Sequence, residues 1–228
     1  MKRRQFAVIG LGRFGSAMAT TLTELGQDVI GVDGQAERVR ELADVVTQAI
    51  ELDATDVRAL RAAGIQDVDV AVVSIGENIE SSLLVVMQLR EIGVQHIVAK
   101  AVTPLHGKIL EKLGVSRVIF PEREMAIRIA HGLVTPDVID YIELSRDFSI
   151  VELPASPTFV GQTLKQLELR PRYGLTLIAI KRKPDGAGAD APVVTNVAPA
   201  ADETIRSGDV LVLLGNNEKL NQLDTMFK

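Results

Sequence analysis

The chain has 228 residues, of which 46% are hydrophobic and 24% are charged, with a formal net charge of −5. The absence of cysteine excludes disulfide bonds, thiolate catalysis and cysteine-bound zinc. The acidic balance and the scattered basic residues argue against nucleic acid as a partner.

The first predicted element is a buried strand over residues 6–10, shortly after Lys2-Arg3-Arg4. This apolar run is too short for the core of a signal peptide. No other run approaches the roughly 20 apolar residues that a membrane helix needs. We therefore expect a cytoplasmic globular protein with one large or two small domains.

Three glycines, Gly10, Gly12 and Gly15, come next in a GxGxxG pattern. They suit a tight turn, close approach of the backbone to phosphate, and close packing of a helix whose first amides face the phosphates. Asp33 ends a second apolar run, where a carboxylate can accept hydrogen bonds from both hydroxyls of an adenosine ribose and would repel a 2′-phosphate. Glycine-rich turns are common, but the strand, the glycines, the helix and the acidic residue together predict nucleotide binding.

Arg13 lies between the second and third glycines, at the predicted helix entrance. Its guanidinium can reach a terminal phosphate through charge-assisted hydrogen bonds, which suits ATP or ADP slightly better than NAD. The alternative is a solvated arginine on the first helical turn. For the neighbouring Phe14, packing is a better explanation than ligand contact.

Apolar runs and helical segments alternate as far as residue 120. Uniformly apolar strands indicate burial on both faces, and regular βα alternation predicts a parallel sheet with right-handed crossovers. The predicted fold is α/β, a Rossmann-type doubly wound sheet. Strands are expected over residues 6–10, 28–33, 46–52, 68–74, 96–99 and 117–120, and helices up to 25, up to 42 and over 57–63, 78–92 and 104–113.

Ligands of such sheets bind at the carboxyl ends of the strands, near the switch in strand order. The Asp53-Ala54-Thr55 segment can contact an adenine edge or can cap the next helix. Lys100 can face a phosphate or solvent. The expected cofactor-binding residues at this edge are Gly10, Leu11, Gly12, Arg13, Phe14, Gly15, Asp33, Asp53, Ala54, Thr55, Ile75, Gly76 and Lys100.

A helix is predicted from Pro121 to about residue 133, with Met125, Ile129 and Leu133 on one side. Because it follows the last strand of the sheet, this apolar side is a candidate for packing on another subunit. Pro136 is expected to interrupt the helix and Asp137 to cap a short continuation, which gives a helix-turn-helix. The predicted parts are a nucleotide-binding domain over 1–121, a crossover over 122–145 and a C-terminal domain over 146–228.

The sequence pattern over residues 146–228 predicts a small α+β domain without a glycine fingerprint. Strands are expected over residues 149–153, 175–181 and 210–214, short helices over 161–167 and 219–227, and a hairpin loop over 184–192. This domain of about 80 residues has a thin core, so pairing with another copy would help it.

Reactive groups for catalysis are not apparent in the sequence. His96, His106 and His131 are isolated, and neither a Walker A lysine motif nor a nucleophile elbow is present. We therefore expect a sensor rather than an enzyme. The alternatives are a small NAD-dependent oxidoreductase and an NADH-sensing regulator; the second would need a basic recognition helix, which this acidic chain does not supply.

Several segments together resemble the RCK family, also called KTN or TrkA-type proteins, and within it the KtrA-like members. The resemblance implies RCK-N and RCK-C domains and a cytosolic regulator of potassium transport at the inner face of the membrane. It also implies an octameric ring, built from dimers, beneath a potassium-translocating subunit of the KtrB or TrkH type. The matching segments are residues 6–15, Asp53-Ala54-Thr55, Ser74-Ile75-Gly76, Pro121-Glu122-Arg123-Glu124-Met125 and 167–174.

The resemblance also implies roles for individual residues. ATP or ADP, or in the broader family NAD or NADH, would be held by the glycine turn and Asp33, with Arg13 at the outer phosphates. Glu122 would be a ligand of a divalent cation, Mg or Ca, beside them. In the RCK-C domain, cyclic di-AMP would bind in a cleft lined by Leu164, Leu167, Arg170, Ile178 and Ile180, although Lys165 replaces an apolar residue of close relatives.

Overall fold

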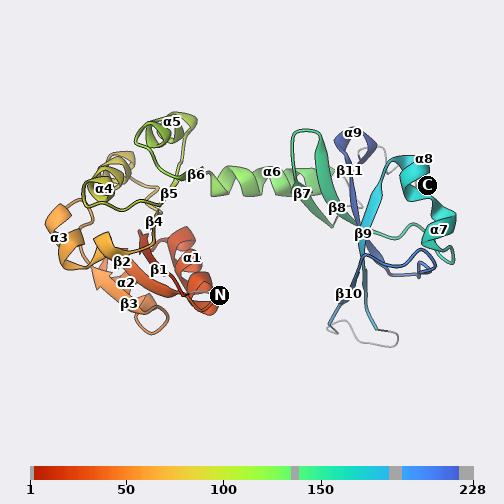
Figure 1. Ribbon diagram of the computed structural model, residues 1–228, viewed down its shortest axis with the longest axis horizontal. Coiled ribbons are helices and arrows are strands. Elements are labelled where there is room, and N and C mark those ends of the chain that lie inside the picture. The colour runs from red at the N-terminus through yellow and green to blue at the C-terminus, as the bar shows by residue number, and fades with distance from the viewer. Residues whose placement is uncertain (1–2, 135–138, 185–191, 221–228) are drawn as a thin grey trace. The chain divides into compact units, whose positions relative to one another are not determined.

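The computed structural model describes residues 3–134, 139–184 and 192–220 (Figure 1). The chain divides into two compact units, Met1–Pro121 and Glu122–Lys228. Among the described residues, no helix combines the length and the apolar character that crossing a membrane requires.

The first unit contains a six-stranded parallel sheet in the order β3-β2-β1-β4-β5-β6. The predicted doubly wound fold is confirmed. Strand β1 lies between β2 and β4, which is the switch point of the strand order. The strands are β1 (Gln5–Ile9), β2 (Asp28–Asp33), β3 (Gln48–Glu51), β4 (Val70–Val73), β5 (Ile97–Lys100) and β6 (Arg117–Ile119). The helices are α1 (Arg13–Glu24), α2 (Ala36–Leu42), α3 (Val57–Ala62), α4 (Ile79–Glu91) and α5 (Pro104–Lys112), with a 3-10 turn over Ile65–Asp67.

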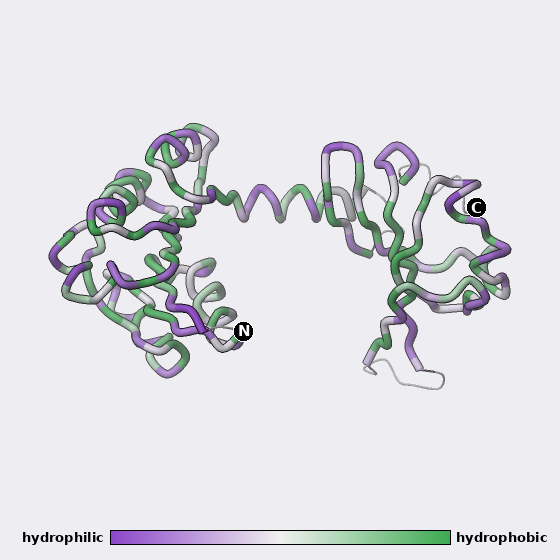
Figure 2. The backbone as a smooth tube through the Cα atoms, in the orientation of Figure 1, coloured by the Kyte–Doolittle hydropathy of each residue, from purple (hydrophilic) through white to green (hydrophobic). Residues whose placement is uncertain are grey.

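The central strands are buried on both faces, as their apolar sequences predict. Ala7 and Ile9 of β1 belong to one hydrophobic cluster, whereas Val8 belongs to a second cluster on the opposite face. Successive side chains of a strand point to opposite faces, so a strand covered by helices on both sides needs an unbroken apolar run. The hydrophobic colouring of these strands is visible in Figure 2.

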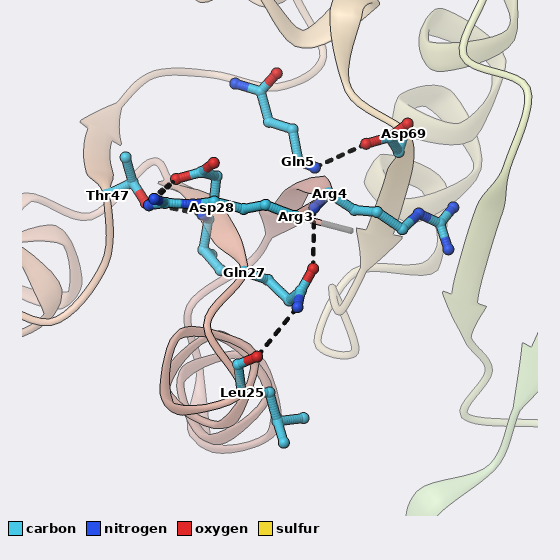
Figure 3. Close-up of polar contacts among 9 residues, drawn as sticks. Arg3, Arg4, Gln5, Leu25, Gln27, Asp28, Thr47 and Asp69 are labelled. Carbon is cyan, nitrogen blue, oxygen red and sulfur yellow. Dashed lines mark hydrogen bonds and ion pairs between the residues drawn. The ribbon is translucent and has the colours of Figure 1, made fainter. Parts of the chain in front are cut away.

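Polar contacts tie together the amino ends of the strands (Figure 3). The backbone N–H of Gln5 donates to Oδ2 of Asp69 at 2.8 Å, and Nη2 of Arg3 donates to Oδ1 of Asp28 at 2.6 Å. These contacts lie at the amino edge of the sheet. A ligand of this fold binds at the opposite edge, where the carboxyl ends of the strands lie.

The second unit contains a five-stranded antiparallel sheet in the order β10-β9-β11-β8-β7. Its core includes Val151, Leu175, Leu211 and Leu213, all nearly inaccessible to solvent. The strands are β7 (Asp140–Glu143), β8 (Phe148–Pro154), β9 (Thr176–Arg182), β10 (Val194–Val197) and β11 (Val210–Asn216). The helices are α6 (Pro121–Val134), α7 (Leu164–Leu167), α8 (Leu169–Tyr173) and α9 (Asn217–Leu220).

The prediction of a helix-turn-helix crossover over 122–145 is wrong in its second half. Helix α6 is present, but Asp140–Glu143 forms strand β7, which pairs with β8 and buries Tyr141. Pairing with a neighbouring strand outweighs the local helix signals here. Thr135, Pro136 and Asp137 lie outside the described residues.

Strand β10 and helix α8 were not expected from the sequence. The residues of β10 are exposed, so they lack the alternation of buried and exposed positions that marks a strand. Of the predicted closing helix, Asn217–Leu220 is helical and residues 221–227 lie outside the described part.

Candidate nucleotide-binding site

The three glycines of the turn have different physical roles. Gly10 has φ of +91°, a left-handed conformation that favours glycine. A Cβ atom on Gly15 would lie 1.8 Å from the carbonyl oxygen of Gly10, so α1 can pack against β1 only without a side chain there. A Cβ on Gly12 would meet nothing within 4 Å, which leaves open space at the start of α1.

Helix α1 begins without a side-chain cap. Its N-cap residue is Gly12, and α2 likewise begins at Gln35 without a side-chain cap, whereas Asp56, Asn78 and Thr103 cap α3, α4 and α5 through their side chains. The first amides of a helix and its dipole together favour an anion. At the carboxyl edge of the sheet, an uncapped helix start is what a phosphate group needs.

Asp33 is fixed by backbone amides at the end of β2. Its side chain is 7% exposed, and Oδ2 accepts a 2.7 Å hydrogen bond from the N–H of Leu11. Oδ1 accepts a 2.9 Å bond from the N–H of Gln35. The carboxylate therefore connects the glycine turn to the loop that follows β2. A carboxylate has about four acceptor positions, so these two bonds leave capacity for a ligand.

Lys100, Phe14 and Gly76 come together at the carboxyl end of β5. Lys100 is 9% exposed, and its Nζ lies 5.9 Å from the centroid of the Phe14 ring. A Cβ on Gly76 would lie 3.3 Å from the same Nζ. The structure thus places a largely buried lysine beside the first turn of α1, and its contact with a phosphate stays a prediction.

The other predicted positions in the first unit lie around this centre. Arg13 is exposed at the first residue of α1. Oδ1 of Asp53 accepts bonds from the N–H and hydroxyl of Thr55 at 2.9 and 2.7 Å, and Asp56 rather than Asp53 caps α3. Ile75 lies next to the glycine turn, since a Cβ atom on Gly10 would be 3.2 Å from Cγ1 of Ile75. A role of the 53–55 turn at an adenine edge stays a prediction.

Glu122 lies at the start of α6 in the second unit, and its side chain is exposed. Among the described residues, no three histidines or carboxylates gather in a group that could hold a metal ion. The predicted cation ligation by Glu122 therefore stays a prediction.

The residues expected to line a cleft in the C-terminal domain have mixed surroundings. Leu167 and Ile180 are buried in the core of the second unit, and Leu164 packs against that core. Arg170 is exposed and Ile178 is half-buried. Of this set, Arg170, Leu164 and Ile178 offer the accessible surface.

A groove of about 420 Å³ runs between α6 and β7 in the second unit. Apolar Ile127 and Ile142 and charged Glu124 and Glu143 contribute to its wall. On α6, Met125 and Ile129 are 50% and 54% exposed, and Figure 2 shows the alternating hydropathy of this helix.

Sequence reasoning missed Arg38 and Glu77. Nη1 of Arg38 lies 3.5 Å from Oδ2 of Asp33, and Nη2 lies 3.6 Å from Oε1 of Glu77. Arg38 could have been found from the sequence, because it is a basic residue near the start of the helix that follows Asp33. Glu77 gave no such signal, because only the sheet order brings its loop beside α2.

Ser74 is a third missed residue. It is buried at the end of β4, 3.0 Å from the position of a Cβ on Gly15, and its Oγ has no hydrogen-bond partner among the residues described. The hydroxyl lies directly below the first turn of α1.

Comparison with protein families gives two matches that together cover most of the chain. The TrkA-N domain matches residues 6–121, and the TrkA-C domain matches residues 148–228. The chain is also 38% identical over 222 residues to Ktr system potassium uptake protein C of Bacillus subtilis, covering 97% of this chain and 96% of that protein.

Two further relatives match over nearly their whole length. Ktr system potassium uptake protein A of B. subtilis is 36% identical, with coverage of 98% of this chain and 97% of the relative. The protein of the same name from Vibrio alginolyticus is 31% identical, with 98% coverage of both chains.

Solved structures share the fold. The GsuK channel matches with a TM-score of 0.67 at 19% identity, over 99% of this chain and 40% of the channel. The GsuK channel bound to NAD matches with a TM-score of 0.53 at 22% identity, over 100% of this chain and 39% of the channel. The chain thus spans about 40% of the length of these channel proteins.

Proposed function

We propose that this chain, which belongs to the family of proteins that join a TrkA-N domain to a TrkA-C domain, is a nucleotide-binding regulatory subunit of a potassium uptake system. The observation that carries this proposal is the match to three Ktr potassium uptake proteins over 97–98% of the chain. An oxidoreductase is not favoured by these relatives.

The proposed ligand of the first unit is ATP or ADP. Along the edge of the sheet, the carboxylate of Asp33 at the end of β2 suits a ribose, and the uncapped start of α1 after β1 and the buried Lys100 at the end of β5 suit phosphates. NAD or NADH would use the same adenosine anchor. Arg13, exposed at the helix entrance, is the residue that we assign to the outer phosphates.

The proposed partners are further copies of the chain and a membrane potassium-translocating subunit of the KtrB or TrkH type. An octameric ring assembled from dimers at the inner face of the membrane would cover the apolar side of α6. Met125 and Ile129, half exposed in the single chain, support such an interface.

The proposed regulation depends on the difference between ATP and ADP. Both share the ribose anchor, but they differ in charge near Arg13 and near Glu122 with its Mg or Ca ion. A ligand shifts an equilibrium only by its difference in affinity for the two states. Reversing a 1:99 ratio to 99:1 needs about 5.5 kcal/mol, which equivalent sites of a ring would share. Cyclic di-AMP would act separately, on the C-terminal domain.

Calorimetric titration of the purified, nucleotide-free protein with ATP, ADP, NAD and NADH tests the ligand. We expect ATP and ADP to bind, and the absence of adenine-nucleotide binding at millimolar concentration would overturn the proposal. Potassium flux with the membrane partner, compared between ATP and ADP for wild type and Arg13→Ala, tests the regulation. The variant should lose the difference between the two nucleotides.

A further inference from the structure

The guanidinium of Arg38 lies between two carboxylates that come from different parts of the first unit. Asp33 ends β2, and Glu77 lies in the loop after β4. In the sheet, β2 and β4 are the two neighbours of β1, so Arg38 spans the carboxyl end of the strand that leads into the glycine turn. Under the proposed function, this is where the ribose binds.

The acceptor positions of Asp33 are almost all in use. Oδ2 receives the N–H of Leu11 and Nη1 of Arg38, and Oδ1 receives the N–H of Gln35. A carboxylate offers about two positions on each oxygen. The two backbone amides therefore leave one position on each oxygen, which matches the two hydroxyls of a ribose, and Arg38 lies at one of them.

Arg38 is the weakest of the three partners of Asp33. The backbone amides donate at 2.7 and 2.9 Å, whereas Arg38 lies at 3.5 Å and is almost equally distant, at 3.6 Å, from Glu77. Its side chain is 31% exposed, and that of Glu77 is 87% exposed. The guanidinium is shared between two carboxylates at the outer limit of an ion pair, so a hydroxyl can displace it more readily than either amide.

We propose that Arg38 sets the ribose specificity of the site by competing with one ribose hydroxyl for Oδ2 of Asp33. On binding, the guanidinium moves from Asp33 to Glu77. A ribonucleotide then gains less binding free energy from its second hydroxyl than it would if Arg38 did not contact Asp33. This inference rests on the proposed function, because it takes the adenosine ribose as the ligand of Asp33.

The test is calorimetric titration of the full chain with ADP, 2′-deoxy-ADP and 3′-deoxy-ADP. The readout is the ratio of each deoxy Kd to the ADP Kd, because the effect of an arginine on the phosphates is common to all three ligands and cancels. In Arg38→Ala the larger ratio should rise about two- to five-fold above wild type, the range expected for release of a partly exposed ion pair.

Arg40→Ala is the matched control, since Arg40 is exposed on the same helix and carries the same charge. Its ratios should equal those of wild type. Arg38→Gln, which keeps most of the stem, serves as the second variant if Arg38→Ala fails to fold, and it should raise the same ratio.

Two results would overturn this inference while leaving the proposed function intact. One is ADP binding by both proteins with unchanged ratios in the Arg38 variants. The other is equal weakening of all three ligands, which would place Arg38 on the base or the phosphates. If wild type takes up no ADP at all, the proposed function itself fails, and this inference fails with it.

Discussion

The backbone N–H of Leu11, inside the glycine turn, donates a 2.7 Å hydrogen bond to Oδ2 of Asp33, 22 residues further along the chain. A residue expected only as a ligand contact therefore also holds the turn in place. The shape of the glycine turn and the proposed ribose acceptor therefore depend on the same side chain.

Replacing Asp33 should reduce both binding and stability. Asp33→Ala leaves the N–H groups of Leu11 and Gln35 without their acceptor, which should lower the free energy of unfolding by about 1–3 kcal/mol. Asp33→Asn keeps one acceptor oxygen and should recover part of the stability but little of the ADP affinity. Urea unfolding and calorimetric titration measure the two effects. Equal stability of wild type and Asp33→Ala would contradict the structural role.

The glycines of the turn should separate folding from binding. Gly15→Ala brings a Cβ to 1.8 Å from the carbonyl oxygen of Gly10, and rigid backbone cannot yield cheaply, so we expect a loss of about 3 kcal/mol or more. Gly12→Ala meets no atom within 4 Å at φ of −66° and should cost less than about 1 kcal/mol. Its methyl group, however, should weaken ADP binding by occupying space for phosphate. Thermal unfolding and titration of both variants test this, and equal stability of the two would be evidence against it.

Part of this structure was predictable because it depends on local sequence. The strands of the parallel sheet are buried on both faces and therefore appear as apolar runs, and the spacing of Gly10, Gly12, Gly15 and Asp33 reflects one continuous βαβ unit. Strand β10 was not predictable, because its exposed residues carry no burial pattern. The contact between Arg38 and Glu77 depends on strand order, which joins segments about 40 residues apart.

The pH dependence of the first unit should involve His106. Its side chain is buried, Nδ1 accepts from the N–H of Val102 at 3.4 Å, and burial lowers its pKa below 6.5. Below about pH 6.5 the unfolded chain binds a proton that the folded state does not, so stability should fall with decreasing pH in that window.

His106→Asn keeps an acceptor near the Nδ1 position and removes the titration. Thermal unfolding between pH 5.5 and 7.5 should therefore depend less on pH in this variant than in wild type. His96→Asn, at an exposed position, is the control and should follow wild type. An identical pH profile for His106→Asn and wild type would contradict the assignment.

The second unit should lose stability in acid through Asp209. This side chain is fully buried, and Arg182 donates to both of its oxygens, at 2.7 and 2.8 Å. Burial alone would raise the pKa of Asp209, but the hydrogen bonds from Arg182 and from the N–H of Arg206 outweigh it and lower the pKa below 3.8. The stabilisation is therefore complete above about pH 4 and is lost as the pH falls further.

Asp209→Asn should cost about 1–3 kcal/mol at pH 7, because it weakens the charge-assisted bonds of Arg182 to its buried partner while Glu203 still contacts Arg182 at 3.0 Å. Hydrogen exchange of the β9 and β11 amides reports this unit by itself. The difference in amide exchange rates between wild type and Asp209→Asn should shrink as the pH falls below about 4. Asp202→Asn, at an exposed position before β11, should leave the exchange unchanged.

The apolar side of α6 should carry an interface between copies of the chain. Met125, Ile129 and Leu133 lie at i, i+4 and i+8, and Ile129 is 54% exposed. Ile129→Glu places a charge on this side, and burying it would cost several kcal/mol, so the oligomer should dissociate into smaller species in sedimentation experiments. Arg123→Glu introduces the same side chain at an exposed position of the helix outside this apolar side and should leave the assembly intact. If Ile129→Glu and wild type sediment alike, the interface lies elsewhere, whereas loss of assembly in both variants would indicate a general effect of charge.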